Sequence, residues 1–398
     1  MKKKICIVTG SRAEYGLFYP LLEEIKREPF FQLQIAVTGM HLSRVYGLTY
    51  KEIARDGFNI NEKVKIPLNN DTPEGITKSL GIGIIGFASV FKRLKPDFVV
   101  LLGDRFETYS SAIAAFLARI PIIHLYGGEL TEGAVDDAFR HSITKMSLLH
   151  FVSAEDYRRR VIQLGEEPSR VFNVGALGID NIKQLKLLSK DELERELNFN
   201  LKGKTVLVTF HPVTLENNTS KQQFNEILAA LNRFQDIKVI FTKPNSDING
   251  KIIIKLIDEY VKRNQERAIA FTSLGRLKYL SLMRHIDVML GNSSSGIIEM
   301  PSFGKPVINV GDRQKGRVIA ENVIQCDPRQ DCILKALKKS FSLKFISVCA
   351  KTKNPYGNGS AAKKMVSILR KEMPEINDLK KKFYDLTSYV SKLEIEKA

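Results

Sequence analysis

The residue types and spacing most suited to chemistry occur in Gly291-Asn292-Ser293-Ser294-Ser295-Gly296-Ile297-Ile298-Glu299. An apolar run, residues 286–290, precedes this segment, and a helix-like run begins at residue 297. Such a turn directs backbone N–H groups and hydroxyls at one point beside the positive end of a helix, which suits an anion and above all a phosphate. Glu299, about one helical turn further on, is placed to reach sugar hydroxyls beyond the phosphates. The segment therefore predicts a phosphate site, although a polar loop with a capped helix has the same pattern.

Other predicted strands are followed by charged or hydrogen-bonding residues beside a glycine or proline. The segments concerned are Gly10-Ser11-Arg12-Ala13-Glu14-Tyr15-Gly16, Gly103-Asp104-Arg105-Phe106-Glu107, Tyr126-Gly127-Gly128-Glu129, His211-Pro212-Val213-Thr214, Lys243-Pro244-Asn245-Ser246-Asp247 and Gly311-Asp312-Arg313-Gln314-Lys315-Gly316-Arg317. In open α/β sheets, ligands bind outside the carboxyl ends of the strands. Turn chemistry explains any one of these segments, but their concurrence indicates a binding site.

The elements that must position these residues are short strand-like runs that alternate with longer helical patterns. One series of runs covers residues 4–9, 33–38, 98–102, 120–125, 150–152 and 171–174, and a second covers 205–210, 238–242, 286–290 and 306–310. The runs are rich in Val and Ile without polar alternation, which is typical of parallel strands buried on both faces. The repetition of strand, helix and strand predicts an α/β fold with doubly wound sheets.

At 398 residues, the chain is long enough for two ordinary domains. We expect an N-terminal doubly wound domain at residues 1–185 and a linker at 186–203. A second doubly wound domain should follow at 204–375, and a basic C-terminal helix or tail at 376–398.

The formal net charge of +17 would suit a nucleic-acid partner. Much of the excess is diffuse, and aromatic residues are not interleaved with clusters such as Lys380-Lys381-Lys382 as a stacking platform requires. We therefore expect a basic solvated surface with a bias toward anionic ligands, and no nucleic-acid partner.

Several common classes of site and location find no support in the sequence. Only four apolar residues follow the basic start before a Gly-Ser-Arg turn, too few for a signal-peptide core, and no apolar run approaches a membrane span. The four cysteines show no CxxC spacing, which favours free thiols in a reducing cytoplasm. The six histidines form no HxH or HExxH pattern, so nothing indicates a metal.

A dinucleotide-binding pattern, Gly81-Ile82-Gly83-Ile84-Ile85-Gly86, is present with Asp104 some twenty residues beyond it. That motif must follow a strand, however, and residues 69–75 are no strand. Residues 76–94 instead predict one helix whose glycines permit close packing at some cost in helix propensity. We therefore do not expect NAD binding.

Taken together, the strand-end residues resemble the UDP-N-acetylglucosamine 2-epimerase family. The matching segments are Ser11 to Glu14, Gly103 to Glu107, Gly127 to Glu129, Asp136 to His141, His211-Pro212, Asn292 to Glu299 and Gly311 to Arg317, in the family's order. The likeness is greatest to the hydrolysing branch, which makes free N-acetylmannosamine or a related sugar for sialic-acid-like nonulosonates. The resemblance implies a GT-B fold, with two Rossmann-like domains facing across a cleft that holds the active site. It also implies nucleotide binding by the C-terminal domain, no metal or redox cofactor, and a homo-oligomer (dimer or tetramer).

The chemistry of such an enzyme explains why these residue types are needed. The hydrogen at carbon 2 of an N-acetylhexosamine becomes acidic only when the anomeric carbon–oxygen bond ionises. A carboxylate then removes the proton while the nucleoside diphosphate departs, and water adds to the resulting glycal with opposite configuration at carbon 2. This route needs cationic and N–H groups on the diphosphate and at least two carboxyl groups with opposed protonation roles.

The candidate site residues follow from this requirement. The acid–base candidates are Asp104, Glu129 and Asp136, and His211 contacts the diphosphate or assists proton transfer. The binding candidates are Arg12, Arg105, Arg140, His141, Asn245, Asp247, Ser293, Ser294, Gly296, Glu299 and Arg313.

Several assignments leave alternatives open. Asp104 and Asp136 are equally placed to be structural partners of Arg105 and Arg140. The resemblance to the non-hydrolysing and animal enzymes of the family implies a glutamate directly before the two glycines, where this chain has Tyr126; the second carboxyl group is therefore Glu129 or Glu132.

Four further positions are treated separately. Lys145 shares a helix face with Arg140 and His141, a face that could hold sugar or phosphate or form a solvated edge. His124 is expected to be a satisfied, partly buried histidine, and we assign no function to His41, His150 or His285.

The function predicted is hydrolysis and 2-epimerisation of a nucleotide-activated N-acetylhexosamine, UDP-N-acetylglucosamine first. One rival keeps this chemistry with a GDP-sugar or a UDP-2,4-diacetamido-trideoxy sugar of the legionaminic acid route. A second rival is a GT-B glycosyltransferase, which would need an acceptor but no carboxylate set at Asp104, Glu129 and Asp136. A third is a non-enzymatic nucleotide-sugar sensor.

Overall fold

The computed structural model of the chain describes residues 2–68, 72–131, 135–212, 219–244, 250–375 and 379–386. Of the predicted site residues, Asn245 and Asp247 lie outside the described residues, as does the alternative carboxyl group Glu132. Two compact units make up the chain. Unit 1 comprises Met1–Glu129, Asp136–Asp180 and Gly359–Ala398, and unit 2 comprises Leu130–Val135 and Asn181–Asn358.

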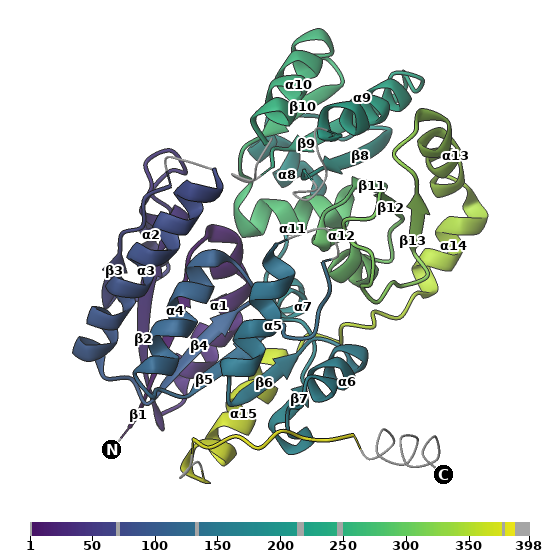
Figure 1. Cartoon of the computed structure of the whole chain (residues 1–398). Coiled ribbons are helices and arrows are strands. Elements are labelled where there is room, and N and C mark those ends of the chain that lie inside the picture. The colour runs from purple at the N-terminus through teal and green to yellow at the C-terminus, as the bar shows by residue number, and fades with distance from the viewer. Residues whose placement is uncertain are drawn as a thin grey trace, which may run out of the picture. The chain divides into compact units, whose positions relative to one another are not determined.

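Unit 1 is built on a parallel sheet that has seven strands within the described residues, in the order β3-β2-β1-β4-β5-β6-β7 (Figure 1). The strands are β1 (Lys3–Thr9), β2 (Phe31–Thr38), β3 (Glu62–Val64), β4 (Phe98–Leu102), β5 (Ile122–Leu125), β6 (Leu149–Val152) and β7 (Val171–Asn173). The helices are α1 (Arg12–Arg27), α2 (Tyr50–Arg55), α3 (Pro73–Leu94), α4 (Phe106–Leu117), α5 (Asp136–Met146), α6 (Glu155–Gln163) and α15 (Ala361–Glu372), with α7 (Leu177–Gln184) leading out of the unit and 3-10 turns η1 (Gly39–Leu42), η2 (Pro168–Arg170) and η4 (Met373–Glu375).

Unit 2 has a parallel sheet of six strands, counted over the described part of the chain, in the order β10-β9-β8-β11-β12-β13. The strands are β8 (Lys204–Thr209), β9 (Ile237–Thr242), β10 (Ala268–Phe271), β11 (Val288–Gly291), β12 (Val307–Val310) and β13 (Val323–Cys326). The helices are α8 (Lys190–Leu197), α9 (Ser220–Leu231), α10 (Gly250–Arg263), α11 (Gly275–His285), α12 (Ser294–Ile298), α13 (Gln330–Ser340) and α14 (Leu343–Lys351), with the 3-10 turn η3 (Met300–Phe303).

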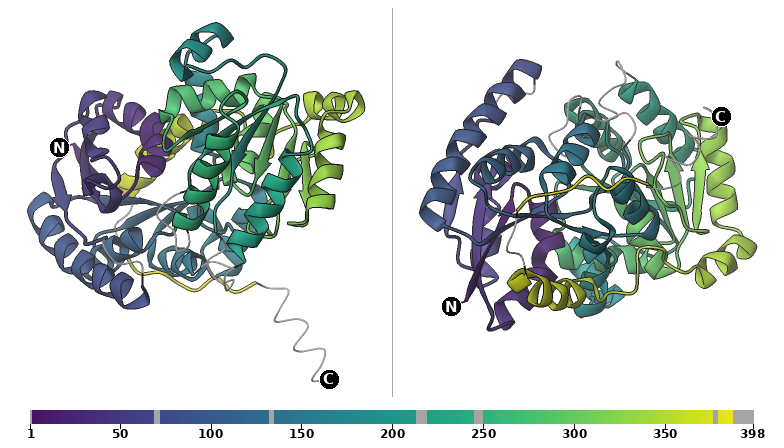
Figure 2. Two further views of the ribbon diagram at one scale, coloured as in Figure 1. Left: turned by 90° about the horizontal axis from the view of Figure 1, so that it is seen from above. Right: turned by 60° about the horizontal axis from the view of Figure 1, so that its bottom comes forward.

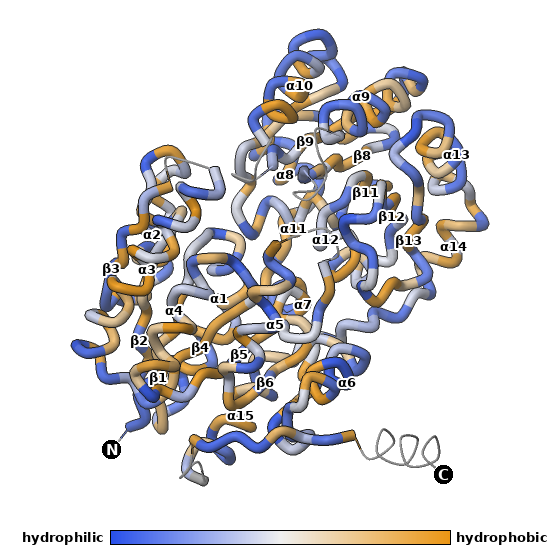
Figure 3. The backbone as a smooth tube through the Cα atoms, viewed as in Figure 1, coloured by the Kyte–Doolittle hydropathy of each residue, from blue (hydrophilic) through white to orange (hydrophobic). Residues whose placement is uncertain are grey.

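Both sheets follow the doubly wound order, which confirms the predicted α/β class. In each sheet, successive strands are added first on one side of the first strand and then on the other. The strand order therefore reverses between β1 and β4 in unit 1 and between β8 and β11 in unit 2. Apolar residues of the strands form the core of each unit, and Figure 3 shows this apolar colour along the strands of unit 1. Ligands bind at such reversal points in open α/β sheets, so each unit offers one place for a site.

Helix α3 contains the dinucleotide-like glycine pattern, as the sequence predicts. A Cβ atom on Gly83 would lie 2.7 Å from Ser110 Oγ, and one on Gly86 would lie 2.6 Å from Val64 Cγ1. These glycines therefore allow α3 to pack closely on α4 and β3 rather than bind a dinucleotide. Among the described helices, α3 is also long and apolar enough, by length and composition alone, to cross a membrane. Polar residues interrupt its apolar residues, so it contains no long unbroken apolar run. Its residues Phe87, Val90 and Phe91 are buried in the core of unit 1.

Helix α15 lies in unit 1, whereas the predicted domain boundaries place it with the C-terminal domain. It lies beside α1 in both views of Figure 2. The carboxylate of Asp180, which is buried, accepts hydrogen bonds from the N–H groups of Ala361 (2.9 Å) and Ala362 (2.8 Å) at the start of α15. A carboxylate at a helix N-terminus satisfies otherwise unpaired N–H groups and opposes the helix dipole. The pairing joins positions too far apart in the sequence for a local pattern to predict.

Candidate functional site

In unit 2, the reversal point depends on a close approach of β11 to β8. Gly291 has a φ angle of 137°, and a Cβ atom there would lie 1.9 Å from the carbonyl oxygen of Thr209. Only glycine tolerates both the backbone conformation and the contact. This glycine therefore brings the segment that begins at Asn292 directly beside His211.

The buried side chain of Asn292 holds the two strand ends together. Its Oδ1 accepts a hydrogen bond from the N–H of His211 (2.7 Å), and its Nδ2 donates to the His211 carbonyl (2.8 Å). An amide side chain supplies both a donor and an acceptor, which no carboxylate or hydroxyl does in this geometry. The sequence places Asn292 in the serine-rich motif, but it could not show this pairing because the partner is 81 residues away.

The loop after β12 is tied to the same residue. The carbonyl of Asn292 accepts hydrogen bonds from Arg313 Nη1 (3.2 Å) and from Gln314 Nε2 (2.8 Å). Gln314 is buried. His211, Asn292 and Arg313, predicted from three separate strand ends, are therefore neighbours in the structure.

The serine-rich turn forms the short helix α12, with Ser293 as its N-cap. The Ser293 hydroxyl accepts a hydrogen bond from the N–H of Ser295 (3.4 Å), and Ser294 begins the helix. Gly296 has a packing role, because a Cβ atom there would lie 2.9 Å from Val307, and its N–H donates to the Ser293 carbonyl (3.1 Å). Glu299 is buried at the end of this helix.

Tyr279 on α11 is a further polar group at this site that the sequence did not indicate. Burial raises the pKa of this phenol to about 12, although the nearby side chains of Ser295, Ser293 and Thr209 act in the opposite direction. It therefore remains a neutral donor at any physiological pH. The unit 2 site thus consists of hydroxyl, amide and backbone groups beside Arg313, which is an arrangement suited to an anion.

In unit 1, the corresponding reversal point brings together charged groups. Arg140 on α5 donates one hydrogen bond to the Asp104 carboxylate, which follows β4, and another to the carbonyl of Glu129 (2.7 Å). The same guanidinium donates to Asp137 Oδ1 (2.8 Å). Arg140 is buried, so these pairs fix the positions of two predicted acid–base residues. The partner of Asp104 is Arg140 and not the neighbouring Arg105 named in the alternative interpretation.

The second carboxyl candidate, Glu129, is buried and accepts a hydrogen bond from the Ser153 hydroxyl (2.8 Å) through Oε1. Tyr126, at the position of the family glutamate, has a φ angle of 64° and accepts a hydrogen bond from the N–H of Leu177 (2.8 Å) through its hydroxyl. Tyr126 therefore has a structural contact toward α7. Of the two candidates for the second carboxyl group, Glu129 is connected to Asp104 because both residues accept hydrogen bonds from Arg140. Glu132 is outside the described residues.

Asp136 is the first residue of α5, and the imidazole of His141 lies one turn beyond Asp137 on the same helix. His141 Nε2 lies 3.4 Å from Asp137 Oδ2, and burial lowers the pKa of the imidazole although Asp137 acts in the opposite direction. Lys145, further along the predicted face, instead donates to Glu166 Oε1 (2.7 Å). Asp136, Arg140 and His141 thus lie in the N-terminal half of α5, whereas Lys145 is near its C-terminal end and pairs with Glu166.

A third carboxyl group, Glu14, lies at the end of β1. Its Oε2 accepts a hydrogen bond from the N–H of Gly10 (2.7 Å), and its Oε1 lies 3.8 Å from Arg105 Nε. Arg105 also donates two hydrogen bonds of 3.3 Å to the buried Glu107. Burial, opposed by Arg105 and reinforced by Glu107, raises the pKa of Glu14 to about 7. Glu14 was recognised only as part of a motif, although two buried carboxyl groups here share one guanidinium.

Arg12 begins α1 at the same strand end, and burial lowers the pKa of its guanidinium while Glu52 acts in the opposite direction. His124 has hydrogen-bonding partners as predicted but is fully buried and not partly so, with Nδ1 3.1 Å from the Thr144 hydroxyl and Nε2 2.8 Å from the Gly103 carbonyl. Burial lowers the pKa of this imidazole to about 3. Neutral His124 therefore donates to Gly103, the residue directly before Asp104. Within the described residues, no group of three or more His, Cys, Asp or Glu side chains is placed to hold a metal ion.

Known proteins resemble the chain over most of its length. Residues 23–370 match the family model described as UDP-N-acetylglucosamine 2-epimerase. The chain is 47% identical over 326 residues to the GDP/UDP-N,N'-diacetylbacillosamine 2-epimerase (hydrolyzing) of Campylobacter jejuni, covering 82% of this chain and 85% of that one. It is 41% identical to polysialic acid biosynthesis protein P7 of Escherichia coli, covering 97% of this chain and 100% of that protein.

Solved structures show the same fold. The UDP-N-acetylglucosamine 2-epimerase of Neisseria meningitidis, solved with UDP-N-acetylglucosamine bound, superposes with a TM-score of 0.80 at 21% identity, covering 92% of this chain and 100% of that one. This likeness confirms the GT-B class of fold. The chain belongs to the UDP-N-acetylglucosamine 2-epimerase family and is an enzyme of its hydrolysing type.

Proposed function

We propose that the substrate is a nucleoside diphosphate derivative of N,N'-diacetylbacillosamine, which the enzyme hydrolyses and epimerises at carbon 2. The observation that carries this proposal is the 47% identity to the Campylobacter jejuni enzyme of that name. The UDP-N,N'-diacetylbacillosamine 2-epimerase of Legionella pneumophila, 39% identical over 93% of this chain, gives further support. The proposal favours the legionaminic acid type of route over the N-acetylglucosamine substrate that we expected first.

We propose that the unit 2 site binds the nucleotide. The α12 turn, Arg313 and the hydroxyl of Tyr279 supply donors suited to the growing negative charge on a departing diphosphate. The backbone of His211 is held by Asn292, two residues before α12 begins, and Glu299 is assigned to the ribose hydroxyls.

We propose that the unit 1 site performs the proton transfers. Asp104 takes or relays the proton at carbon 2, and Glu129 or Asp136 supplies the second carboxyl group for hydration of the glycal. Arg140 contacts the Asp104 carboxylate and the main-chain carbonyl of Glu129, so one guanidinium joins the two segments that carry these residues. Opposed protonation roles for two carboxyl groups are the requirement of a reaction that both removes and returns a proton.

UDP-N-acetylglucosamine is the second candidate substrate. Its support is the 41% identity over nearly the whole length of the polysialic acid biosynthesis protein P7. The two candidates differ at carbons 4 and 6 of the sugar. N,N'-diacetylbacillosamine has an acetamido group on carbon 4, and its carbon 6 is a methyl group, whereas N-acetylglucosamine has a hydroxyl group on each of these carbons.

The test is a kinetic comparison of four substrates: the UDP and GDP forms of N,N'-diacetylbacillosamine and of N-acetylglucosamine. NMR identifies each product and its configuration at carbon 2. We expect the highest kcat/KM with a diacetylbacillosamine substrate. A higher kcat/KM with UDP-N-acetylglucosamine would overturn the proposal in favour of the second candidate, and turnover only with an added acceptor would indicate a glycosyltransferase.

We also propose that the enzyme is a cytoplasmic homodimer. The outer face of α3 presents Ile82 and Ile85, which are 44% and 71% exposed, and a second copy would cover this apolar face. The four cysteines are free thiols, which a reducing compartment preserves. A monomer at micromolar concentration in light scattering, or an unchanged dimer in Ile85→Glu, would contradict the role proposed for α3.

A further inference from the structure

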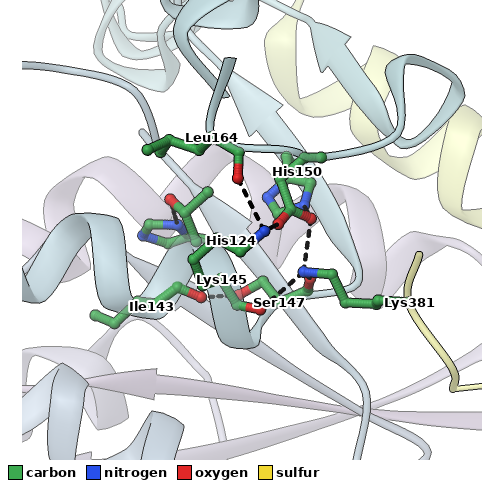
Figure 4. Close-up of polar contacts among 9 residues, drawn as sticks. His124, Ile143, Lys145, Ser147, His150, Leu164 and Lys381 are labelled. Carbon is green, nitrogen blue, oxygen red and sulfur yellow. Dashed lines mark hydrogen bonds and ion pairs between the residues drawn. The ribbon is translucent and has the colours of Figure 1, made fainter. Parts of the chain in front are cut away.

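A buried carboxylate in unit 1 is surrounded by cations that have no place in the proposed chemistry. Glu166, 2% exposed at its side chain, accepts a hydrogen bond from Lys145 Nζ (2.7 Å) through Oε1. Its Oε2 lies 2.9 Å from His150 Nε2 and 2.6 Å from Lys381 Nζ. Figure 4 shows Lys145, His150 and Lys381 converging on this point from separate segments of the chain. Hydrogen bonds from His150 and the two lysines outweigh burial and lower the pKa of Glu166 to about 2.

Lys381 joins this cluster to the end of α5. Its ammonium donates to the carbonyls of Lys145 (2.8 Å) and Ser147 (2.6 Å), as Figure 4 shows for the contact at Ser147. Carbonyl groups at a helix C-terminus lack partners within the helix and favour a nearby cation. A lysine ammonium has three N–H donors, and Glu166 with these two carbonyls accounts for all three.

The residues after Lys381 are seated as well. The N–H of Tyr384 donates to the Gly165 carbonyl (3.0 Å), and the Phe383 ring centroid lies 5.0 Å from Lys145 Nζ. A Cβ atom on Gly165 would lie 2.4 Å from the Phe383 ring, and the φ angle of Gly165 is 84°. The Phe383 ring thus packs directly on Gly165, and the segment is held by hydrogen bonds from the main chain of Tyr384 and the side chain of Lys381.

Helix α5 connects this cluster to the proposed catalytic carboxylates by two sets of contacts. Arg140 of α5 contacts the Asp104 carboxylate and the Glu129 carbonyl. Thr144 of α5 contacts His124, whose other nitrogen lies 2.8 Å from the carbonyl of Gly103, the residue before Asp104. A displacement of the C-terminal end of α5 therefore reaches Asp104 through both contacts.

We propose that residues 379–386 form a clasp on unit 1 and that Lys381 is a positioning residue for the sugar chemistry. By fixing the C-terminal end of α5, Lys381 keeps Arg140 and Thr144 where they orient Asp104 and Glu129. This inference rests on the proposed roles of Asp104 and Glu129, but the contacts of the clasp itself do not. The contacts of Lys381, Phe383 and Tyr384 given above are all with residues of unit 1.

The test compares Lys381→Met with Lys382→Met, which removes the same charge from the exposed neighbouring side chain. We expect kcat of Lys381→Met to fall by about 10- to 100-fold, the range for a small misplacement of a catalytic group, with KM and UDP affinity within twofold of wild type. Hydrogen exchange of the amides of residues 141–147 should become faster in Lys381→Met alone. Lys382→Met should match wild type in every measurement.

A second pair of measurements separates positioning from general stability. In Lys381→Ala, added ethylammonium should restore part of kcat, because it replaces the missing donor. Phe383→Ala, which keeps the ammonium, should lower kcat by a smaller factor and leave KM unchanged. An unchanged kcat in Lys381→Met, or an equal loss of kcat and UDP affinity without rescue by ethylammonium, would overturn the inference.

These outcomes are distinct from a failure of the proposed function. If Asp104→Asn keeps wild-type turnover, the assignment of Asp104 fails, whereas the exchange of residues 141–147 still reports whether the clasp holds α5. Unchanged exchange in Lys381→Met would overturn the clasp whatever Asp104 does.

Discussion

The two reversal points of the molecule have the same sheet topology but different chemistry. In unit 2, between β8 and β11, most contacts are made by neutral groups, with the amide of Asn292 as the central residue. In unit 1, between β1 and β4, the contacts are ionic, with carboxylates facing Arg105 and Arg140. Preorganised neutral donors suit an anion that must be held in one place. Titratable groups with matched countercharges suit the transfer of protons. The difference supports our proposal of a binding site in unit 2 and a reaction site in unit 1.

The largest effect that separates the two sites is expected from Asp104→Asn. The substitution keeps the shape and an accepting oxygen for Arg140 but removes the base, so turnover should fall by at least about 100-fold. UDP affinity, measured by calorimetry, should stay within twofold of wild type. Asp156→Asn, at an exposed position on α6 in the same unit, is the control and should keep wild-type turnover. Equal losses of turnover and UDP affinity in Asp104→Asn would remove the division between the sites.

Much of this division could be predicted from the sequence, because strand ends in a parallel sheet meet at one edge. That rule predicted Asp104, Glu129 and His211 from separate segments, whereas Arg140, on α5, was predicted from the family resemblance. It could not show which partners they have: Asn292 and His211 are joined across 81 residues, and Arg140 and Asp104 across 36. The predicted strands also omit β3, β10 and β13, which are short edge strands with partly exposed residues. Polar residues interrupt β3 and β13, and the apolar run of β10 is only four residues long.

The ionic character of the unit 1 site can also be tested at Glu14, through the pH dependence of the free energy of unfolding. The pKa of Glu14, raised to about 7 by burial, lies above its ordinary value in the unfolded chain. The folded protein therefore holds more protons than the unfolded one between about pH 4.5 and 7, and this group's contribution to stability falls as pH rises through that window. Removing it in Glu14→Gln should flatten the pH dependence by about 1–3 kcal/mol.

The measurement for Glu14 is the free energy of unfolding by urea at pH 5 and pH 8 for wild type and Glu14→Gln. Taking the difference between the proteins cancels the opposite contributions of His41 and His124, whose pKa values are lowered by burial to about 4 and about 3. Glu23→Gln, at a position further along α1, serves as the control. Parallel curves for wild type and Glu14→Gln would show that the carboxyl group is ionised throughout and would contradict the shared-guanidinium description.

The two hydrogen bonds between the Asn292 amide and the His211 main chain are tested by Asn292→Asp. Aspartate preserves the acceptor for the His211 N–H but cannot donate to the His211 carbonyl, and its charge opposes a bound phosphate. We expect UDP affinity to fall by about 1–3 kcal/mol, with a smaller change in kcat at saturating substrate. Asn200→Asp, in the exposed loop before β8, should bind UDP like wild type. Unchanged UDP affinity in Asn292→Asp would place the nucleotide elsewhere.

The smallest expected effect concerns a single hydroxyl of the α12 turn. Ser294→Ala should lose one hydrogen bond to a phosphate, about 1.5 kcal/mol if the bond is charge-assisted. Ser347→Ala, exposed on α14, is the matched control. Calorimetry with UDP distinguishes the two variants. If Ser294→Ala and Arg313→Ala both bind UDP as tightly as wild type, the α12 turn is a capped loop and not a nucleotide site.

The central claim is that the carboxylates of unit 1 remove and return a proton at carbon 2 while the nucleoside diphosphate departs. The most direct test is the isotopic content of the product when the wild-type enzyme turns over its substrate in deuterated water. Because the glycal must take its new proton from solvent, NMR should find deuterium at carbon 2 of the released sugar. A product that retains the original hydrogen at carbon 2 would contradict elimination and would leave Asp104 as a structural partner of Arg140.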